Sequence, residues 1–189
     1  DMAFADCIRI SSVVIPDGVT SLGVAVFKNC TALNRISVGD GVTEIGGNLF
    51  EGCTSLSEIH FGASVSNIDV FSFADAALSE ISVSPHNESF SSYNGKLYSK
   101  DKTTFLCYPK GSKEKTFTLP KSVTHIADSA FEKCESLGEV ILPAKLKSVG
   151  KNAFRGCTAL WKINLGQSLT DLGAHAFQSC KSLIEVDLP

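Results

Sequence analysis

A phenylalanine and a cysteine recur together at a spacing of twenty-three positions along this chain of 189 residues. The cysteine follows the phenylalanine by three positions in six places: Phe4–Cys7, Phe27–Cys30, Phe50–Cys53, Phe131–Cys134, Phe154–Cys157 and Phe177–Cys180. Phe73 keeps the same step, but Ala76 replaces the cysteine. A fixed period of this length indicates a solenoid, because one such repeat cannot bury its own apolar residues and stacked repeats can.

The complete repeat, numbered from its first apolar residue, reads L-x-x-I-x-L-P-x-x-V-x-x-I-G-x-x-x-F-x-x-C-x-x. Its first residues alternate between apolar and polar, which predicts a short strand with one buried face. Pro or Gly at the seventh position ends that strand, and the next apolar pair predicts a second short extended segment. We predict one helical turn in the tract that leads to the cysteine, for example in residues 151–154.

The fold class that follows is a repeat solenoid, a curved superhelix of short parallel β-strands with turns and short helical turns. We expect residues 1–189 to form a single domain of about eight coils. The coils begin near Ile10, Leu33, Leu56, Leu78, Glu114, Leu137, Leu160 and Leu183. Since the chain starts and stops within a repeat, we expect it to be a fragment of a longer protein.

The repeat that begins at Leu78 is the longest, because it extends as far as Lys113. The Asn94-Gly95 pair between apolar flanks predicts a β-hairpin, and a turn at 100–102 precedes another predicted strand at 104–108. We therefore expect residues 84–113 to form an irregular hairpin insert. Six lysines between Lys96 and Lys115 face two acidic residues, which gives a net charge of +4. This basic segment is a candidate site for an anionic glycan; the alternative is an exposed hairpin edge protected by lysines.

Composition and charge narrow the classes of protein. Hydrophobic residues make up 43% of the chain and charged residues 20%, as in globular domains. No apolar run is long enough to cross a membrane, so we expect no membrane insertion in this segment. Residues 1–95 carry 3 basic and 11 acidic side chains, net −8, whereas residues 96–189 carry 14 and 9, net +5. This asymmetry either steers a charged partner or is only a solvated surface, and we expect no nucleic-acid partner.

The sequence lacks the motifs that carry chemistry. It has no H-E-x-x-H, no C-x-x-C, no G-x-G-x-x-G and no G-x-S-x-G. We therefore predict no catalytic residue, no metal site, no cofactor and no enzyme activity. The six periodic cysteines are predicted to be buried and reduced, with Cys107 the most accessible thiol. Two glycosylation patterns, at Asn29 and Asn87, matter only if a eukaryote exports the protein.

A binding surface is predicted at the second, third and fifth repeat positions, which point outward from each strand. These positions vary while the inward ones stay apolar, as on a recognition surface, although exposed positions also vary by simple drift. The candidate binding residues are Arg35, Glu58, His60, Glu80, Glu139, Trp161, Lys162 and Asn164. Trp161 is the only tryptophan, a residue enriched at interface hot spots; alternatively, its ring lies flat on Ile141 or Lys162.

The six Phe-x-x-Cys pairs closely resemble the BspA-like leucine-rich repeat family, the class whose repeat has this length and contains a cysteine. The insert shares the family's Tyr93, Gly95, Leu97-Tyr98 and Tyr108-Pro109 features. The chain lacks the asparagine of commoner leucine-rich repeats, so another group must satisfy the backbone.

This resemblance implies a ligand-binding or adhesion module that recognises proteins or glycans and is displayed at a cell surface or secreted. It implies host extracellular-matrix proteins, such as fibronectin and fibrinogen, as partners. The alternatives are a structural spacer or scaffold region of a larger multidomain protein, or an appendage to an enzyme. Fold-level analogy alone does not choose among them.

Overall fold

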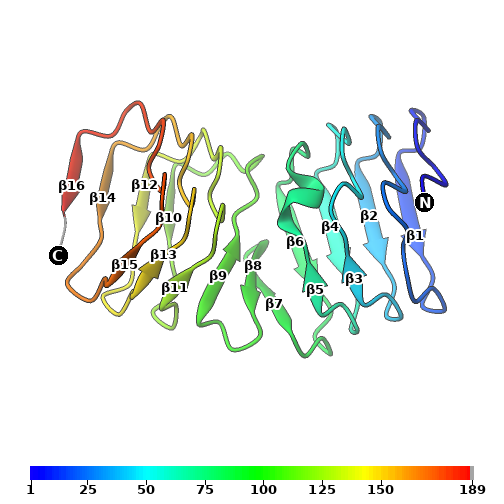
Figure 1. The fold of residues 1–189 in the computed structure, drawn as a ribbon, viewed down its shortest axis with the longest axis horizontal. Coiled ribbons are helices and arrows are strands. Elements are labelled where there is room, and N and C mark those ends of the chain that lie inside the picture. The colour runs from blue at the N-terminus through cyan, green and yellow to red at the C-terminus, as the bar shows by residue number, and fades with distance from the viewer. Residues whose placement is uncertain (188–189) are drawn as a thin grey trace. The chain divides into compact units, whose positions relative to one another are not determined.

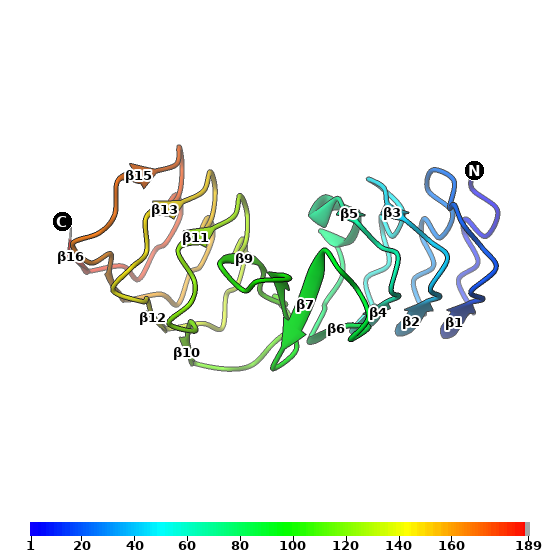
Figure 2. The ribbon, with the colours of Figure 1, turned by 90° about the horizontal axis from the view of Figure 1, so that it is seen from below.

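The computed structural model describes residues 1–187 as stacked coils of short parallel strands. Contacts within the chain group it into two compact units, Asp1–Lys96 and Leu97–Pro189. Figure 1 shows the strands of each unit side by side, and Figure 2 shows that each unit carries two sheets on separate walls of its coils. The predicted solenoid of about eight coils is confirmed.

Unit 1 contains one four-stranded and one two-stranded parallel sheet. The first consists of β1 (Ser12–Ile15), β2 (Arg35–Val38), β4 (Glu58–Phe61) and β6 (Glu80–Val83), and the second of β3 (Glu44–Ile45) and β5 (Asn67–Ile68). Ile36 is aligned with Ile59, and Ile59 with Ile81. All three are buried, so the register places equivalent apolar residues on top of one another.

Unit 2 repeats this arrangement. Its first sheet consists of β10 (Thr116–Thr118), β12 (Glu139–Ile141), β14 (Lys162–Asn164) and β16 (Glu185–Asp187). Its second sheet contains β15 (Asp171–Leu172), β13 (Ser148–Val149), β11 (His125–Ile126), β9 (Thr104–Cys107) and β8 (Lys96–Ser99). The predicted second extended segment of each regular coil is therefore a very short strand in this sheet.

The insert contains the predicted turn and strands. Asn94 and Gly95 both adopt positive φ, 49° and 72°, between β7 (Phe90–Tyr93) and β8. β9 then runs antiparallel to β8 and parallel to β11. Tyr108 stands one repeat length before Phe131 and takes the place of the missing phenylalanine, since its backbone N–H bonds to Ala130 O as Phe131 N–H bonds to Ala153 O. The repeat thus resumes inside the insert.

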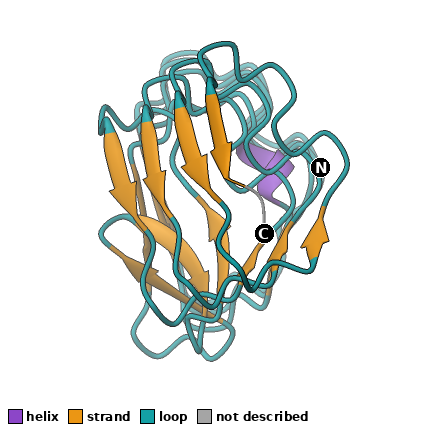
Figure 3. Ribbon diagram, turned by 90° about the vertical axis from the view of Figure 1, so that its left-hand side faces the viewer, coloured by secondary structure: helices purple, strands orange, loops and turns teal. Residues whose placement is uncertain are grey.

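The predicted helical turn before each cysteine is wrong. The tract is built from successive turns, and Figure 3 shows loops and turns along this wall. Its N–H groups bond to the next coil: Phe154 N to Ala176 O at 2.8 Å and Gly156 N to Gln178 O at 2.8 Å. A helical turn would direct these donors to the carbonyls of its own coil. The exception is a 3-10 helix, η1 (Val70–Phe73), capped by Asp69.

Left-handed residues make these turns possible. In each coil that carries a Phe-x-x-Cys pair, the residues two positions before and two positions after the phenylalanine adopt positive φ. In the coil of Phe154 they are Asn152 and Gly156, at 56° and 74°. Asn and Gly tolerate this conformation best, yet Lys133 and Ser179 also adopt it. Stacking therefore imposes the backbone conformation even where the side chain does not favour it.

A ladder of aromatic rings forms the centre of the core. Phe131 stacks on Phe154 with ring centroids 4.6 Å apart, and Phe154 on Phe177 at 5.2 Å. Phe4, Phe27 and Phe50 stack in the same way in unit 1. Offset stacking of this kind adds to the free energy of apolar burial.

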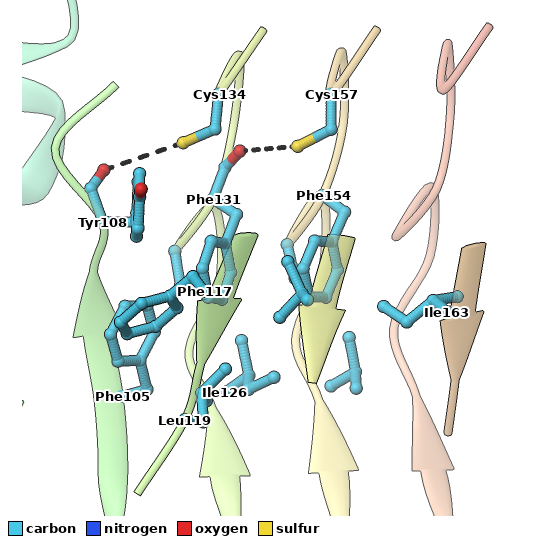
Figure 4. Packing of buried hydrophobic residues seen from close by; sticks show 14 of the residues in the cluster. Phe105, Tyr108, Phe117, Leu119, Ile126, Phe131, Cys134, Phe154, Cys157 and Ile163 are labelled. Atoms are coloured by element: carbon cyan, nitrogen blue, oxygen red, sulfur yellow. Dashed lines mark hydrogen bonds between the residues drawn. The ribbon is translucent and has the colours of Figure 1, made fainter. Parts of the chain in front are cut away.

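The cysteines satisfy the backbone beside this ladder. The Cys157 thiol donates to Phe131 O of the preceding coil at 3.0 Å, and the Cys53 thiol donates to Phe27 O at 3.0 Å. Figure 4 shows the Cys157 bond and its neighbour, from Cys134 to Tyr108 O at 3.8 Å. The thiols of Cys30, Cys53, Cys134, Cys157 and Cys180 thus act as inter-coil donors in addition to filling space. All seven cysteines are free, as predicted.

The prediction that the six periodic cysteines are buried is confirmed for four of them and wrong for two. Cys30, Cys53, Cys134 and Cys157 are buried, while Cys7 and Cys180 are partly exposed. Cys107 is also only partly exposed, and burial raises its thiol pKa to about 12. Cys7 donates to no carbonyl among the described residues, so it replaces Cys107 as the thiol we expect to react first.

Ser72 places a polar side chain at an apolar position of the core. Its position holds Leu49, Ala130 and Ala153 in other coils. Its side chain is 0% exposed, and its hydroxyl has no hydrogen-bond partner among residues 1–187. A buried polar group without a partner costs free energy that an apolar side chain does not.

Replacing Ser72 should therefore stabilise the protein. We expect Ser72→Ala to raise the free energy of unfolding by about 1 kcal/mol, because it removes an unsatisfied hydroxyl. Urea denaturation gives the measurement. Ser84→Ala is the control, since the Ser84 hydroxyl accepts a bond from His86 N and its removal should not raise stability. A lower midpoint for Ser72→Ala would show that its hydroxyl is satisfied.

Removing a ring from the ladder should have the opposite effect. We expect Phe154→Ala to cost about 3–5 kcal/mol of stability, because the stacked coils cannot collapse into the cavity. Phe71→Ala is the control, since Phe71 is exposed. Equal denaturation midpoints for the two variants would contradict the aromatic ladder.

Thiol titration tests the cysteine ladder. After denaturation without reductant, all seven thiols should react. In the native protein at pH 8, Cys53 and Cys180, with pKa values raised by burial to about 11, should stay protonated and react slowly. Unfolded thiols ionise near the ordinary value of 9.0, so the fold should lose stability as the pH rises above about 9. Fewer than seven thiols would reveal disulfides.

Candidate binding surfaces

The outward face of the first sheet in unit 1 is polar. Arg35 forms an ion pair with Glu58 of the next coil at 2.7 Å, and His60 Nδ1 lies 3.0 Å from the Ser82 hydroxyl. These residues and Glu80 line a groove of about 260 Å³. Side chains of both charges line it beside Ile36 and Ile59, so the groove can form ion pairs and hydrogen bonds.

The outward face of the first sheet in unit 2 is different. A groove of about 320 Å³ is lined by Glu139, Ile141, Lys162 and Asn164 together with the Leu142-Pro143-Ala144 turn. The side chains of Ile141, Trp161 and Ile184 are exposed on this face. We call this surface, comprising Glu139, Ile141, Trp161, Lys162 and Asn164, the unit 2 strand face.

Carboxylates surround the lysine of this face. Lys162 Nζ bonds to Glu185 Oε1 at 2.6 Å. This bond raises the lysine pKa, and the charges of Glu185, Asp187 and Glu139 raise it further. Three carboxylates thus face one ammonium group, which leaves the strand face locally acidic around an exposed aromatic ring.

Trp161 lies beside the preceding coil. A methyl group at Gly138 would sit 3.7 Å from Trp161 Cδ1, in ordinary van der Waals contact, so the indole lies next to the Gly138 backbone. The residue remains 43% exposed. The ring therefore covers backbone on one side and leaves the rest of its surface for a partner.

The eight residues predicted from the sequence divide into two groups. Arg35, Glu58, His60 and Glu80 line the groove of unit 1, and Glu139, Trp161, Lys162 and Asn164 belong to the unit 2 strand face. The sequence reasoning missed Glu185 and Asp187, the partners of Lys162. The repeat that begins at Leu183 was the available signal, because it places both residues at outward positions.

The lysines of the insert do not form one patch. Lys96 is only 4% exposed. Lys100 and Lys102 precede β9, while Lys110 and Lys115 follow it. The lysines that are close together in the sequence of the insert therefore lie before and after β9.

The described residues also bear on metal binding, membrane insertion and glycosylation. Among the described residues, no three His, Cys, Asp or Glu side chains lie close enough to hold a metal ion. No helix among them is long and apolar enough to cross a membrane. Asn87 is buried and its amide nitrogen donates to Gly62 O and Val65 O, so a glycan cannot be attached there without breaking both bonds. Asn29 is partly exposed and bonds to Asp6.

Solved structures share this fold. A leucine-rich repeat protein from Eubacterium ventriosum is 19% identical over 100% of this chain and 69% of its own length, with a TM-score of 0.63. The pneumococcal vaccine antigen PcpA is 20% identical over 94% of this chain and 63% of its own, with a TM-score of 0.63. A leucine rich cell surface protein from Faecalibacterium prausnitzii is 20% identical over 99% of this chain and 81% of its own, with a TM-score of 0.56. These identities demonstrate a common fold alone.

The sequence also matches a family model. No curated protein matches the sequence. The model of the BspA type leucine rich repeat region, however, matches six copies, over residues 1–100 and 101–189. Both matched segments carry the Phe-x-x-Cys pairs whose thiols and rings form the two inter-coil ladders. The chain therefore belongs to the BspA-type leucine-rich repeat family.

Proposed function

We propose that this chain is a protein-binding module whose partner docks on the unit 2 strand face. The observation that carries the proposal is the exposed Trp161, which directly precedes β14, whose Lys162 has the carboxylates of Glu139, Glu185 and Asp187 nearby. An aromatic anchor within a polar rim is the usual composition of a binding hot spot. The coils hold this surface in place before the partner arrives, which reduces the entropy lost on binding.

The chemistry of the strand face favours a partner segment that combines apolar and basic side chains. Glu139, Glu185 and Asp187 outnumber Lys162 there. A partner arginine can stack on the Trp161 indole and reach Glu139 beside it, which joins a cation–π contact to an ion pair. Ile141 and Ile184 supply apolar contact on the same face.

A place at the cell surface or in the secreted fraction is part of the same proposal. Two relatives in fold support it, since one is described as a cell surface protein and another as a vaccine antigen. The family resemblance adds adhesion to extracellular-matrix proteins, with fibronectin and fibrinogen as the first partners to test. We propose no catalytic role. The alternative is a spacer or scaffold region of a larger protein, for which the outward residues would have no ligand.

Mutation of Trp161 tests the proposal. We expect the chain to bind immobilised fibronectin or fibrinogen, and Trp161→Ala to weaken binding by at least about 2 kcal/mol, or about thirtyfold. Surface plasmon resonance gives the dissociation constants. Phe71→Ala is the matched control, because it removes an exposed ring from another surface. Binding that survives Trp161→Ala would move the site elsewhere, and no binding to either protein would favour the spacer.

The fluorescence of the single tryptophan provides a second test. Because Trp161 is partly exposed, acrylamide should quench it in the free protein, and a bound partner should reduce that quenching. Strong protection in the free protein would mean that the ring is covered and would exclude Trp161 as an anchor.

A further inference from the structure

Four lysines gather on one edge of unit 2, beyond the end of the strand face. They lie in or beside the turns that lead into the second sheet, and we call them the lysine ridge: Lys102, Lys121, Lys145 and Lys147. The sequence does not group them, because Lys102 belongs to the insert and the others to two later coils.

Hydrogen bonds between coils bring these turns together. The Ser122 hydroxyl donates to Lys102 O at 2.9 Å. Thr124 N bonds to Thr103 O at 2.8 Å, and Lys147 N bonds to Thr124 O at 2.7 Å. Three consecutive coils are thus in direct contact along the ridge, with neighbours about 4.8 Å apart. Figure 1 shows the corresponding strands β9, β11 and β13 adjacent to one another.

Three of the ridge lysines have no evident structural task. Lys121, Lys145 and Lys147 are exposed. None of the ion pairs between residues 1–187 includes any of these three. Their positions contribute nothing to the apolar core. Their charges are therefore available to a ligand.

The equivalent turns of unit 1 carry the opposite charge and do have a task. Asp17 and Asp40 occupy the repeat position of Lys121. Asp17 accepts a bond from Asp40 N at 3.0 Å, and Asp40 accepts one from Ala63 N at 2.7 Å. The fold itself thus uses the acidic residues at these turns, whereas Lys121 forms no ion pair with any residue of the described chain.

We propose that the lysine ridge binds a linear anionic polysaccharide, such as a sulfated glycan. Ammonium groups on flexible stems suit sulfates or carboxylates spaced along a chain. The advance of about 4.8 Å per coil is comparable to the length of one sugar residue. Ser168 is exposed in the turn of the following coil and can bond to sugar hydroxyls. The Ser122 and Thr170 hydroxyls donate to Lys102 O and Lys147 O, and their oxygens can accept bonds from the sugar. This surface is separate from the strand face and does not rest on it.

A single-stranded nucleic acid fits the ridge less well. Its bases need aromatic faces on which to stack. Among the Phe, Tyr and Trp residues that the structure describes in unit 2, Trp161 is the exposed one, and it precedes β14, whereas the ridge turns follow the strands of that sheet. Charge and hydroxyl groups alone favour a sugar polymer.

Binding of dextran sulfate to the whole chain tests the proposal. At about 0.15 M salt, fluorescently labelled dextran sulfate should bind, unsulfated dextran of the same length should not, and added salt should weaken binding. The triple variant Lys121→Gln, Lys145→Gln, Lys147→Gln should bind at least about tenfold more weakly. Trp161→Ala should leave this binding unchanged, which separates the ridge from the proposed protein site.

A matched triple removes the same charge elsewhere. Lys113, Lys151 and Lys181 are exposed and lie outside the ridge, so their replacement by glutamine should change binding by less than about twofold. Equal losses from both triples would mean diffuse attraction and would overturn the proposal. So would an absence of binding to dextran sulfate, or equally tight binding of a single-stranded oligonucleotide with the same loss in the ridge triple.

Discussion

Hydrogen bonding from coil to coil is the constraint on which the rest of this structure depends. Neighbouring coils exchange backbone hydrogen bonds along three walls: both sheets and the turn tract before the cysteine. A single coil of this length has too little interior to bury its own backbone, so every unpaired group must find its partner in a neighbour. The period is nearly constant for this reason, although the coil that begins at Leu56 is one residue shorter and still aligns Ile59 with Ile81.

The cysteine and the phenylalanine of the repeat together satisfy that constraint. The carbonyl of Phe131 accepts Cys134 N from its own coil at 3.1 Å and the Cys157 thiol from the next at 3.0 Å. The ring of the same residue fills the core. A thiol supplies a weak donor on a small apolar side chain, so it can satisfy a carbonyl without a void or an uncompensated charge. The thiol thereby supplies the backbone with a side-chain donor in a repeat that has no asparagine ladder.

A frame held by backbone bonds does not need every outward side chain for its own stability. Trp161 is an exposed aromatic residue on the strand face. The lysine ridge is a row of charged residues on turns. Both belong to unit 2, yet they differ in chemistry and lie at different points of the coil. Two ligands of different class can therefore be served by one set of stacked repeats.

The sequence by itself determined the solenoid, the strand positions, the buried phenylalanines and the reduced cysteines, because these follow from a period and from the polarity of single residues. It also predicted eight outward residues as binding candidates, since alternation along a strand indicates which side chains face out. Only the tertiary structure decided the conformation of the cysteine tract, because alternate N–H groups of this tract bond to the adjacent coil. Only it decided which lysines act together: Lys96 is buried, and Lys102 meets the turn of Lys121 through bonds between coils. Such groupings depend on contacts across repeats, which no local pattern in one repeat records.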